Sequence, residues 1–242
     1  MDLQSDLYSS GSACSFPLPM SLLEVKEVNK TFGKRQILNK ISFSCKTGEI
    51  IGLFGRNGSG KSSLLKGVMG TLKMDSGEVF IDGMKIKTSE IIPQQIIGFI
   101  PQDTFLPKEM KVRDIIPLMF PKGEEQDRIF YSDGVSAFEN QKTGKLSAGQ
   151  LKYLELLLLA HLSHAFLFLD EPFSMVEPQY IEKIKELLIS LKSTKGIVVT
   201  DHYYRDVLQV ATRSFVLKKG NLFKVENEED LATHKYLKVR NQ

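Results

Sequence analysis

The chain has 242 residues, 42% of them hydrophobic and 25% charged, so it is long enough for one large globular domain with a buried core. Its formal net charge is only +3, and no Lys and Arg run is dense enough to indicate a nucleic acid or a lipid surface as the main partner. Two cysteines, Cys14 and Cys45, are too few for a disulfide scaffold and favour an intracellular setting. No stretch reaches the ~18 consecutive apolar residues that a membrane-spanning helix needs.

The domain limits follow from local composition. Residues 1–19 are rich in Ser, Gly and Pro and lack the basic start and apolar middle of a signal peptide, so we expect a disordered N-terminal tail. A single folded domain is then expected over residues 20–232, with a C-terminal tail over residues 233–242.

The first part of this domain has the pattern of short strands. Runs over residues 22–28 and 37–45, together with a hairpin over residues 78–86 that turns at Asp82-Gly83, predict an N-terminal antiparallel β subdomain. The apolar run 50–54 predicts a strand that leads into a glycine-containing loop, and residues 62–69 predict a helix.

The rest of the domain alternates between helices and strands. A short strand over residues 96–100 comes before residues 103–160, which we expect to form an inserted helical subdomain. The remaining elements expected are strands over 166–169 and 197–200, an amphipathic helix over 180–192 between them, and a terminal hairpin of the segments 215–217 and 222–225. This alternation predicts an α/β fold with a mainly parallel sheet flanked by helices.

Residues 55–62 match the pattern G-x-x-x-x-G-K-[ST] between a predicted strand and a predicted helix, where a phosphate-binding loop is expected. In such a loop the backbone N–H groups wrap the phosphates, Lys61 reaches the terminal phosphates and Ser62 is a ligand of Mg²⁺. The sequence therefore predicts the core of a P-loop NTPase with ATP and Mg²⁺ as cofactors. The nucleotide-binding residues expected from this loop are Gly55, Arg56, Asn57, Gly58, Ser59, Gly60, Lys61, Ser62 and Ser63.

Two acidic residues, Asp170 and Glu171, directly follow the apolar residues 166–169. A strand that ends in two acids places them at the carboxyl edge of a parallel sheet, beside the phosphate loop. Hydrolysis of a phosphoanhydride needs a carboxylate for the metal and a group that orients the attacking water. We expect Asp170 to hold Mg²⁺ and Glu171 to polarise the water.

From residue 22 to about residue 231 the sequence resembles the ATP-binding cassette ATPases. Five motifs occur in the order typical of that family: the loop 55–62, Gln102, Leu146-Ser147-Ala148-Gly149-Gln150, Asp170-Glu171 and His202. The third motif is similar to the family's L-S-G-G-Q signature, with Ala148 in place of a glycine.

The resemblance implies roles for several residues. Gln102 would contact Mg²⁺ and relay the nucleotide state, His202 would contact the γ-phosphate, and Phe32 would stack on the adenine. It also implies a head-to-tail dimer in which one subunit serves the ATP of the other through Ser147, Ala148, Gly149 and Gln150. The helix that starts near Ser147 would then point its N–H groups at the γ-phosphate.

The family also implies partners and a location. The chain is expected to be the cytoplasmic ATP-hydrolysing subunit of a transporter, held at the inner face of the membrane by separate transmembrane permease subunits. A homodimer and a heterodimer with a second such ATPase both fit. Residues 170–173 and 200–208 resemble the ATPase of the bacterial lipopolysaccharide exporter. Two alternatives stay open: a soluble ATPase of the iron–sulfur assembly type and a regulatory cassette with weak turnover.

Besides Ala148, a second residue departs from the family pattern. Glu177 stands where the family usually has an aspartate in its dimer-contact loop. The additional methylene is either a tolerated exchange of one acid for another or a cause of slower or asymmetric hydrolysis.

Overall fold

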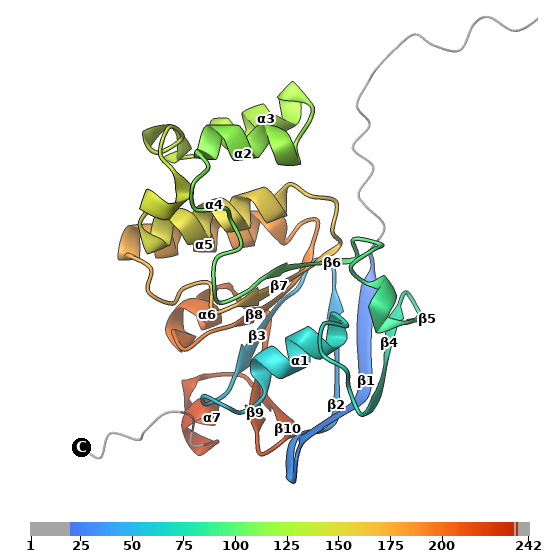
Figure 1. The fold of residues 1–242 in the computed structure, drawn as a ribbon. Coiled ribbons are helices and arrows are strands. Elements are labelled where there is room, and N and C mark those ends of the chain that lie inside the picture. The colour runs from blue at the N-terminus through green and yellow to red at the C-terminus, as the bar shows by residue number, and fades with distance from the viewer. Residues whose placement is uncertain (1–19, 235, 237–242) are drawn as a thin grey trace, which may run out of the picture.

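The structure is a computed structural model that describes residues 20–234 and residue 236. It contains a four-stranded antiparallel sheet in the order β2-β1-β4-β5 and a six-stranded sheet in the order β10-β9-β3-β8-β7-β6 (Figure 1). In the larger sheet all neighbouring strands are parallel except β10, which pairs antiparallel with β9. The predicted α/β fold, with its antiparallel subdomain and mainly parallel sheet, is confirmed.

The elements have the following bounds. The strands are β1 Leu22–Phe32, β2 Arg35–Lys46, β3 Ile50–Phe54, β4 Ser76–Ile81, β5 Met84–Ile86, β6 Ile97–Ile100, β7 Phe166–Asp170, β8 Gly196–Thr200, β9 Arg213–Lys218 and β10 Asn221–Val225. The helices are α1 Lys61–Val68, α2 Val112–Met119, α3 Gly123–Phe130, α4 Ala148–Ala160, α5 Pro178–Leu191, α6 Tyr204–Val210 and α7 Glu228–Thr233, with short 3₁₀ turns at Thr88–Glu90, Val135–Ala137 and Thr143–Lys145.

Successive residues of the central strands face opposite sides of the larger sheet, because side chains alternate along a strand. Leu167 and Leu169 of β7 join a hydrophobic cluster with α4, α5 and α6. Phe166 and Phe168 join a second cluster with α1 and the antiparallel sheet. The central strands are therefore buried on both faces, which explains why their sequences are almost continuously apolar.

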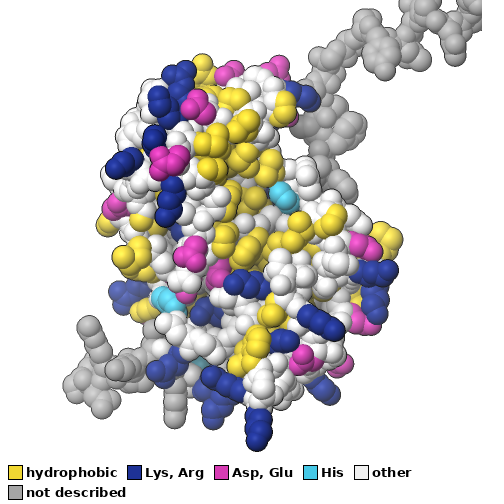
Figure 2. All heavy atoms as spheres, viewed as in Figure 1, with side chains coloured by type: hydrophobic (Ala, Val, Ile, Leu, Met, Phe, Trp, Pro, Cys, Tyr) yellow, Lys and Arg dark blue, Asp and Glu magenta, His cyan; other side chains and the backbone are white. Residues whose placement is uncertain are grey.

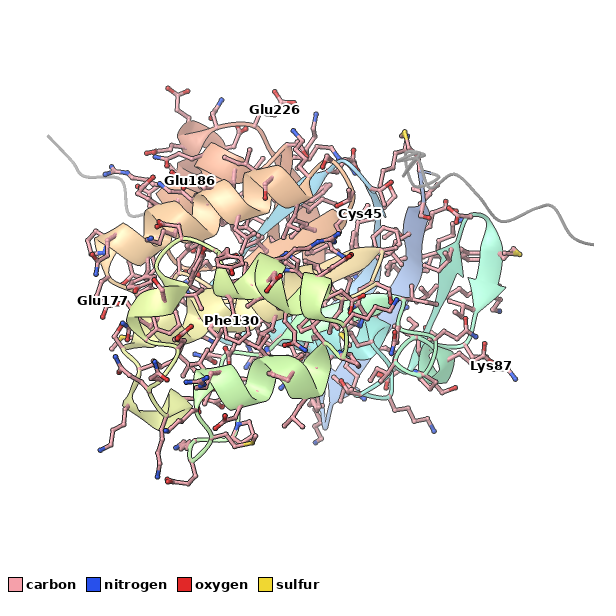
Figure 3. The ribbon with its side chains drawn as sticks, turned by 90° about the horizontal axis from the view of Figure 1, so that it is seen from above. Cys45, Lys87, Phe130, Glu177, Glu186 and Glu226 are labelled. Atoms are coloured by element: carbon pink, nitrogen blue, oxygen red, sulfur yellow. The ribbon has the colours of Figure 1, made fainter. Side chains whose placement is uncertain are left out.

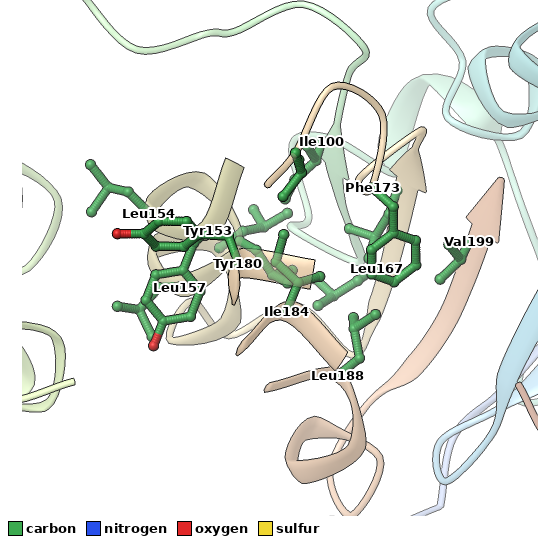
Figure 4. Packing of buried hydrophobic residues seen from close by; sticks show 14 of the residues in the cluster. Ile100, Tyr153, Leu154, Leu157, Leu167, Phe173, Tyr180, Ile184, Leu188 and Val199 are labelled. Atoms are coloured by element: carbon green, nitrogen blue, oxygen red, sulfur yellow. The ribbon is translucent and has the colours of Figure 1, made fainter. Parts of the chain in front are cut away.

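Residues between β6 and β7 form the helical part of the fold, which contains α2, α3, two 3₁₀ turns and α4. Figure 1 shows α2 and α3 farthest from the sheet, with α4 and α5 between them and the strands. The rings of Tyr153 on α4 and Tyr180 on α5 pack with their centroids 6.1 Å apart (Figure 4). The segment expected to be helical is thus helical, and α4 connects it to the core.

Some features differ from the sequence-based expectation or fall outside it. Helices α6 and α7 were not predicted, and the boundary expected after residue 232 falls inside α7. Tyr236, within the expected C-terminal tail, packs its ring 5.9 Å from that of Phe54. The expected tail over residues 1–19, with Cys14, lies outside the described residues, and no described helix is long and apolar enough to cross a membrane.

Candidate functional site

The loop between β3 and α1 contains the predicted phosphate-binding residues. Gly60, at the N-cap of α1, has φ 109°, and a Cβ built on it would lie 2.5 Å from Cγ2 of Ile37. Only glycine fits this backbone without strain. No acidic residue stands in the first turn of α1, so its N–H groups and the positive end of the helix dipole can attract an anion.

A cleft of about 390 Å³ opens at this loop. Its volume is in the range of small-molecule sites. The residues that line it are Asn57, Gly58, Ser59, Gly60, Lys61, Ser62, Ser63, Gln102, Glu171 and His202. The four residues predicted to be catalytic, which are Lys61, Gln102, Glu171 and His202, are therefore brought together. The last three follow the ends of three different strands.

Glu171 is the most highly connected side chain of the cleft. Its Oε1 lies 2.9 Å from Nε2 of His202, and its Oε2 accepts hydrogen bonds from Gln102 Nε2 at 3.1 Å and Ser174 Oγ at 3.2 Å. The backbone of Glu171 has φ 58°, an uncommon conformation for a residue other than glycine. The fold holds it there in part because its N–H donates to the carbonyl of Thr200 at 2.8 Å. Such backbone strain is typical of functional positions.

Lys61 is the buried cation of the cleft. Its Nζ donates to the carbonyl oxygen of Gly55 at 2.7 Å. Burial lowers the pKa of Lys61, and the nearby charges of Glu171, Asp170 and Asp201 oppose that shift. A buried ammonium group surrounded by acids and backbone donors is well placed to meet the negative charge of a phosphate.

Asp170 does not line the cleft but lies at its edge, as the last residue of β7 and the neighbour of Glu171. It is buried, and its Oδ1 accepts a hydrogen bond from Thr200 Oγ1 at 2.6 Å. Within residues 20–234 and 236, no three His, Cys, Asp or Glu side chains are grouped as a metal site of their own. Oxygen ligands of the kind that Ser62, Gln102 and Asp170 carry fit Mg²⁺, which usually takes its remaining ligands from phosphates and water.

The signature motif lies at the start of α4, outside the residues that line the cleft. Ser147 is the N-cap: its Oγ accepts from the N–H of Gln150, and the Gln150 side chain accepts from the N–H of Ser147. Gly149 is buried and Ala148 is exposed. Both halves of this capping box stabilise the start of α4.

Three other predicted nucleotide-binding residues also lie outside the cleft. Phe32, at the end of β1, is 48% exposed, and Nζ of Lys30 lies 5.1 Å from the centre of its ring. Gly55 is buried, and Arg56 lines a neighbouring cleft of about 340 Å³ instead. An adenine contact at Phe32 and a phosphate contact at Arg56 stay predictions.

Comparison with known proteins decides the family. Residues 38–174, more than half of the chain, match the family described as ABC transporter. The chain belongs to this family. One relative is the lipopolysaccharide export system ATP-binding protein LptB of Haemophilus influenzae, which is 26% identical over 90% of this chain and 96% of the relative. Another is the ABC transporter ATP-binding protein YtrB of Bacillus subtilis, which is 28% identical over 90% of this chain and 76% of the relative.

Solved ABC cassettes have the same fold. One, an ATP-binding cassette of an ABC transporter in its ADP conformation, is 25% identical, with a TM-score of 0.76 over 88% of this chain and 94% of that one. Another is a dimeric cassette in a post-hydrolysis state bound to ADP and Pi; it is 26% identical, with a TM-score of 0.71 over 85% of this chain and 99% of that one. The resemblance inferred from the motifs is therefore confirmed.

Two polar residues of this ABC cassette's site were missed in the sequence. Ser174 donates to Glu171 Oε2, and Asp201 accepts hydrogen bonds from the N–H groups of Phe173 at 2.8 Å and Tyr203 at 2.9 Å. Asp201 is fully buried, and this burial raises its pKa although those N–H groups oppose the shift. The signal for Asp201 was present, because it follows a buried parallel strand just as Glu171 does.

Proposed function

We propose that this chain is the ATP-hydrolysing subunit of an ABC transporter and that it works as a pair of cassettes around two ATP molecules. One observation supports hydrolysis most directly: the carboxylate of Glu171 is held by Gln102 and His202 in the cleft at the phosphate loop. A carboxylate fixed at that position is what a water-orienting base requires.

Each residue of the site then has a role in hydrolysis. The N–H groups of residues 55–63 and the Lys61 ammonium bind the phosphates. Ser62, Gln102 and Asp170 would hold Mg²⁺, which would supply positive charge beside the phosphate oxygens. Glu171 accepts a hydrogen bond from the attacking water, and His202 both orients Glu171 and donates to the γ-phosphate.

A second cassette supplies the remaining contacts. Residues 147–150 lie outside the cleft of their own chain, at the N-terminal start of α4. A dimeric arrangement, as in the solved relative bound to ADP and Pi, would bring this helix start to the γ-phosphate held by the other chain. ATP then joins the two cassettes, and hydrolysis releases them.

The transport partner would bind the helical part of the fold. Several large apolar side chains are exposed there, among them Phe105 at 43%, Leu118 at 72% and Tyr131 at 84%. Figure 2 shows hydrophobic side chains gathered in a band over this part of the molecule. Apolar surface of this kind is typical of protein–protein contacts. We assign the band to the cytoplasmic part of separate membrane-spanning subunits, which would hold the chain at the inner face of the membrane.

Hydrolysis is tested by Glu171→Gln, which keeps the shape of the side chain but removes its capacity as a base. We expect ATP turnover to fall at least ~100-fold while ATP binding persists. Glu186→Gln on the exposed face of α5 is the matched control and keeps its turnover. Full turnover of Glu171→Gln would refute the assignment of the base.

The membrane partner is tested by purification of tagged chain from detergent-solubilised membranes. We expect membrane-spanning subunits to purify with the native chain and with Ile189→Lys, which changes an apolar residue of α5 that is 55% exposed. Leu118→Lys on α2 should no longer purify with these membrane-spanning subunits, because the introduced charge would have to be desolvated in the contact. A soluble complex that forms without detergent would contradict the proposal.

A further inference from the structure

The carboxylate of Glu177 occupies the start of α4 in its own chain. Glu177 is the residue directly before α5, and its Oε2 accepts a hydrogen bond from the N–H of Gly149 at 3.0 Å. The nearby Ser147 hydroxyl helps to lower the pKa of this carboxyl. Figure 3, which views the molecule from above, labels Glu177 where the start of α5 meets α4.

The contact is closely fitted. A Cβ built on Gly149 would collide with Glu177 Oε2 and would lie 2.8 Å from Cβ of Tyr180. The packing of Tyr153 against Tyr180 holds the two helices together beside it. Glycine at position 149 therefore lets the first turn of α4 approach the carboxylate closely enough for its N–H to donate.

Glu177 stays charged in this position. Hydrogen bonds from its own N–H, from Ser147 and from Gly149 lower the pKa of its carboxyl, although burial opposes the shift. The positive end of the α4 dipole favours the same charged form. An anion of this chain thus already accepts from the Gly149 N–H, a donor that the proposed function assigns to the partner's γ-phosphate.

A γ-phosphate and this carboxylate cannot use the same donors together. Each N–H has one hydrogen to donate, and two anions at one helix start repel each other. We propose that Glu177 is an internal competitor of ATP: it must leave the start of α4 before two cassettes can close on nucleotide, and it therefore raises the ATP concentration at which they pair. This inference rests on the proposed function.

The side chain is able to make this movement. Glu177 is only half-buried, and its long side chain belongs to the segment between β7 and α5, where Met175 is 82% exposed. The Gly149 N–H that donates to the carboxylate does not line the phosphate-loop cleft. Release of Glu177 therefore changes pairing without changing how a single chain binds ATP.

The experiment compares pairing in a background that does not turn over. Glu171→Gln protein is titrated with ATP and Mg²⁺, and dimer formation is followed by light scattering behind a sizing column. In this background, a second substitution Glu177→Gln keeps the size of the side chain and removes its charge, whereas Glu177→Ala removes the carboxylate altogether.

Both double variants should lower the ATP concentration at half-dimerisation about fivefold or more, since a charge-assisted hydrogen bond is lost from the competing state. Added Glu186→Gln should leave it unchanged.

The outcomes separate two kinds of failure. Equal or higher ATP midpoints in Glu177→Gln would overturn the inference alone, since a side chain that merely supports α4 would weaken pairing when altered. Absence of any dimer in all variants at saturating ATP would overturn the proposed function and this inference with it. Binding of a fluorescent ATP analogue to single chains gives the control affinity, which we expect to be the same in every variant.

Discussion

His202 Nε2 and Glu171 Oε1 lie 2.9 Å apart, at the ends of the neighbouring strands β8 and β7. Neither residue is near the other in sequence, and the parallel pairing of the two strands brings them together. The imidazole thus fixes one oxygen of the carboxylate while Gln102 and Ser174 contact the other. The position of the acid depends on three separate segments of the chain.

Replacement of His202 tests this dependence. We expect His202→Ala to reduce ATP turnover about 10- to 100-fold with little change in the affinity for ATP, because the carboxylate loses an orienting contact and the γ-phosphate a donor. Steady-state ATPase assays with a separate binding measurement distinguish these effects. His161→Ala, in which the altered ring contacts the carbonyl of Leu157, serves as the control and keeps its turnover. Equal losses in both variants would argue against a specific role of His202.

Lys61 gives a prediction for nucleotide binding. In Lys61→Ala the buried ammonium beside the phosphate loop is lost, and we expect turnover to fall at least ~100-fold. Lys87→Ala removes an exposed lysine elsewhere and should have no effect. Calorimetric titration with ATP and Mg²⁺ shows whether the loss is in binding or in chemistry. Unchanged turnover in Lys61→Ala would remove the phosphate-loop assignment.

Glu155 gives a prediction for the connection between α4 and Gln102. It is fully buried and accepts hydrogen bonds from Thr104 Oγ1 at 2.5 Å and Phe105 N at 3.0 Å. Lys152, 3.8 Å from it, donates to the carbonyl of Gln102 at 2.7 Å. Glu155→Leu leaves these donors unpaired, so we expect the free energy of unfolding in urea to fall by about 2–4 kcal/mol.

The matched variant Glu186→Gln should change the free energy of unfolding by less than about 0.5 kcal/mol, because this side chain is exposed. Loss of turnover in Glu155→Leu at temperatures where the protein is still folded would show that the segment after β6 is held in place by α4. An unaltered unfolding curve would contradict the role given to the buried acid.

Lys195 gives a prediction for pH. Burial lowers its pKa to about 8, whereas in the unfolded chain a lysine titrates at about 10.4. Between these values the unfolded state binds the proton that the folded state has released, so stability rises with pH across this window. We expect the difference in unfolding free energy between native protein and Lys195→Met to increase by about 1–3 kcal/mol from pH ~8 to pH ~10. A difference that stays constant would contradict the lowered pKa.

Much of the fold could be predicted because its signals are local. The apolar run at β3, the glycines after it and the two acids after β7 each specify a strand end, and parallel pairing then brings the strand ends to one edge. Helix α6 was missed because seven residues are too few to show a helical period. Helix α7 has one buried residue, Leu231, and so gives an equally weak pattern.

The unpredicted part of the site depends on contacts between distant segments. Glu155 interrupts an apolar run, and nothing in that run shows that Thr104 and Phe105 satisfy its carboxylate. The contact between Glu177 and Gly149 likewise joins two helices whose relative position comes from the packing of Tyr153 on Tyr180. Sequence patterns indicated which residues are candidates for the chemistry, but the partners of these acids became visible only in three dimensions.

The segment between β7 and α5 carries both Glu171 and Glu177, which act on different nucleotides in the proposed pair. One acid serves the ATP held by its own chain, and the other is set against the ATP held by the neighbour. Since both belong to one short connection, a movement of this connection at one nucleotide would also move the acid that faces the other nucleotide of the proposed pair. The two nucleotide sites of such a pair would therefore be coupled through the segment between β7 and α5.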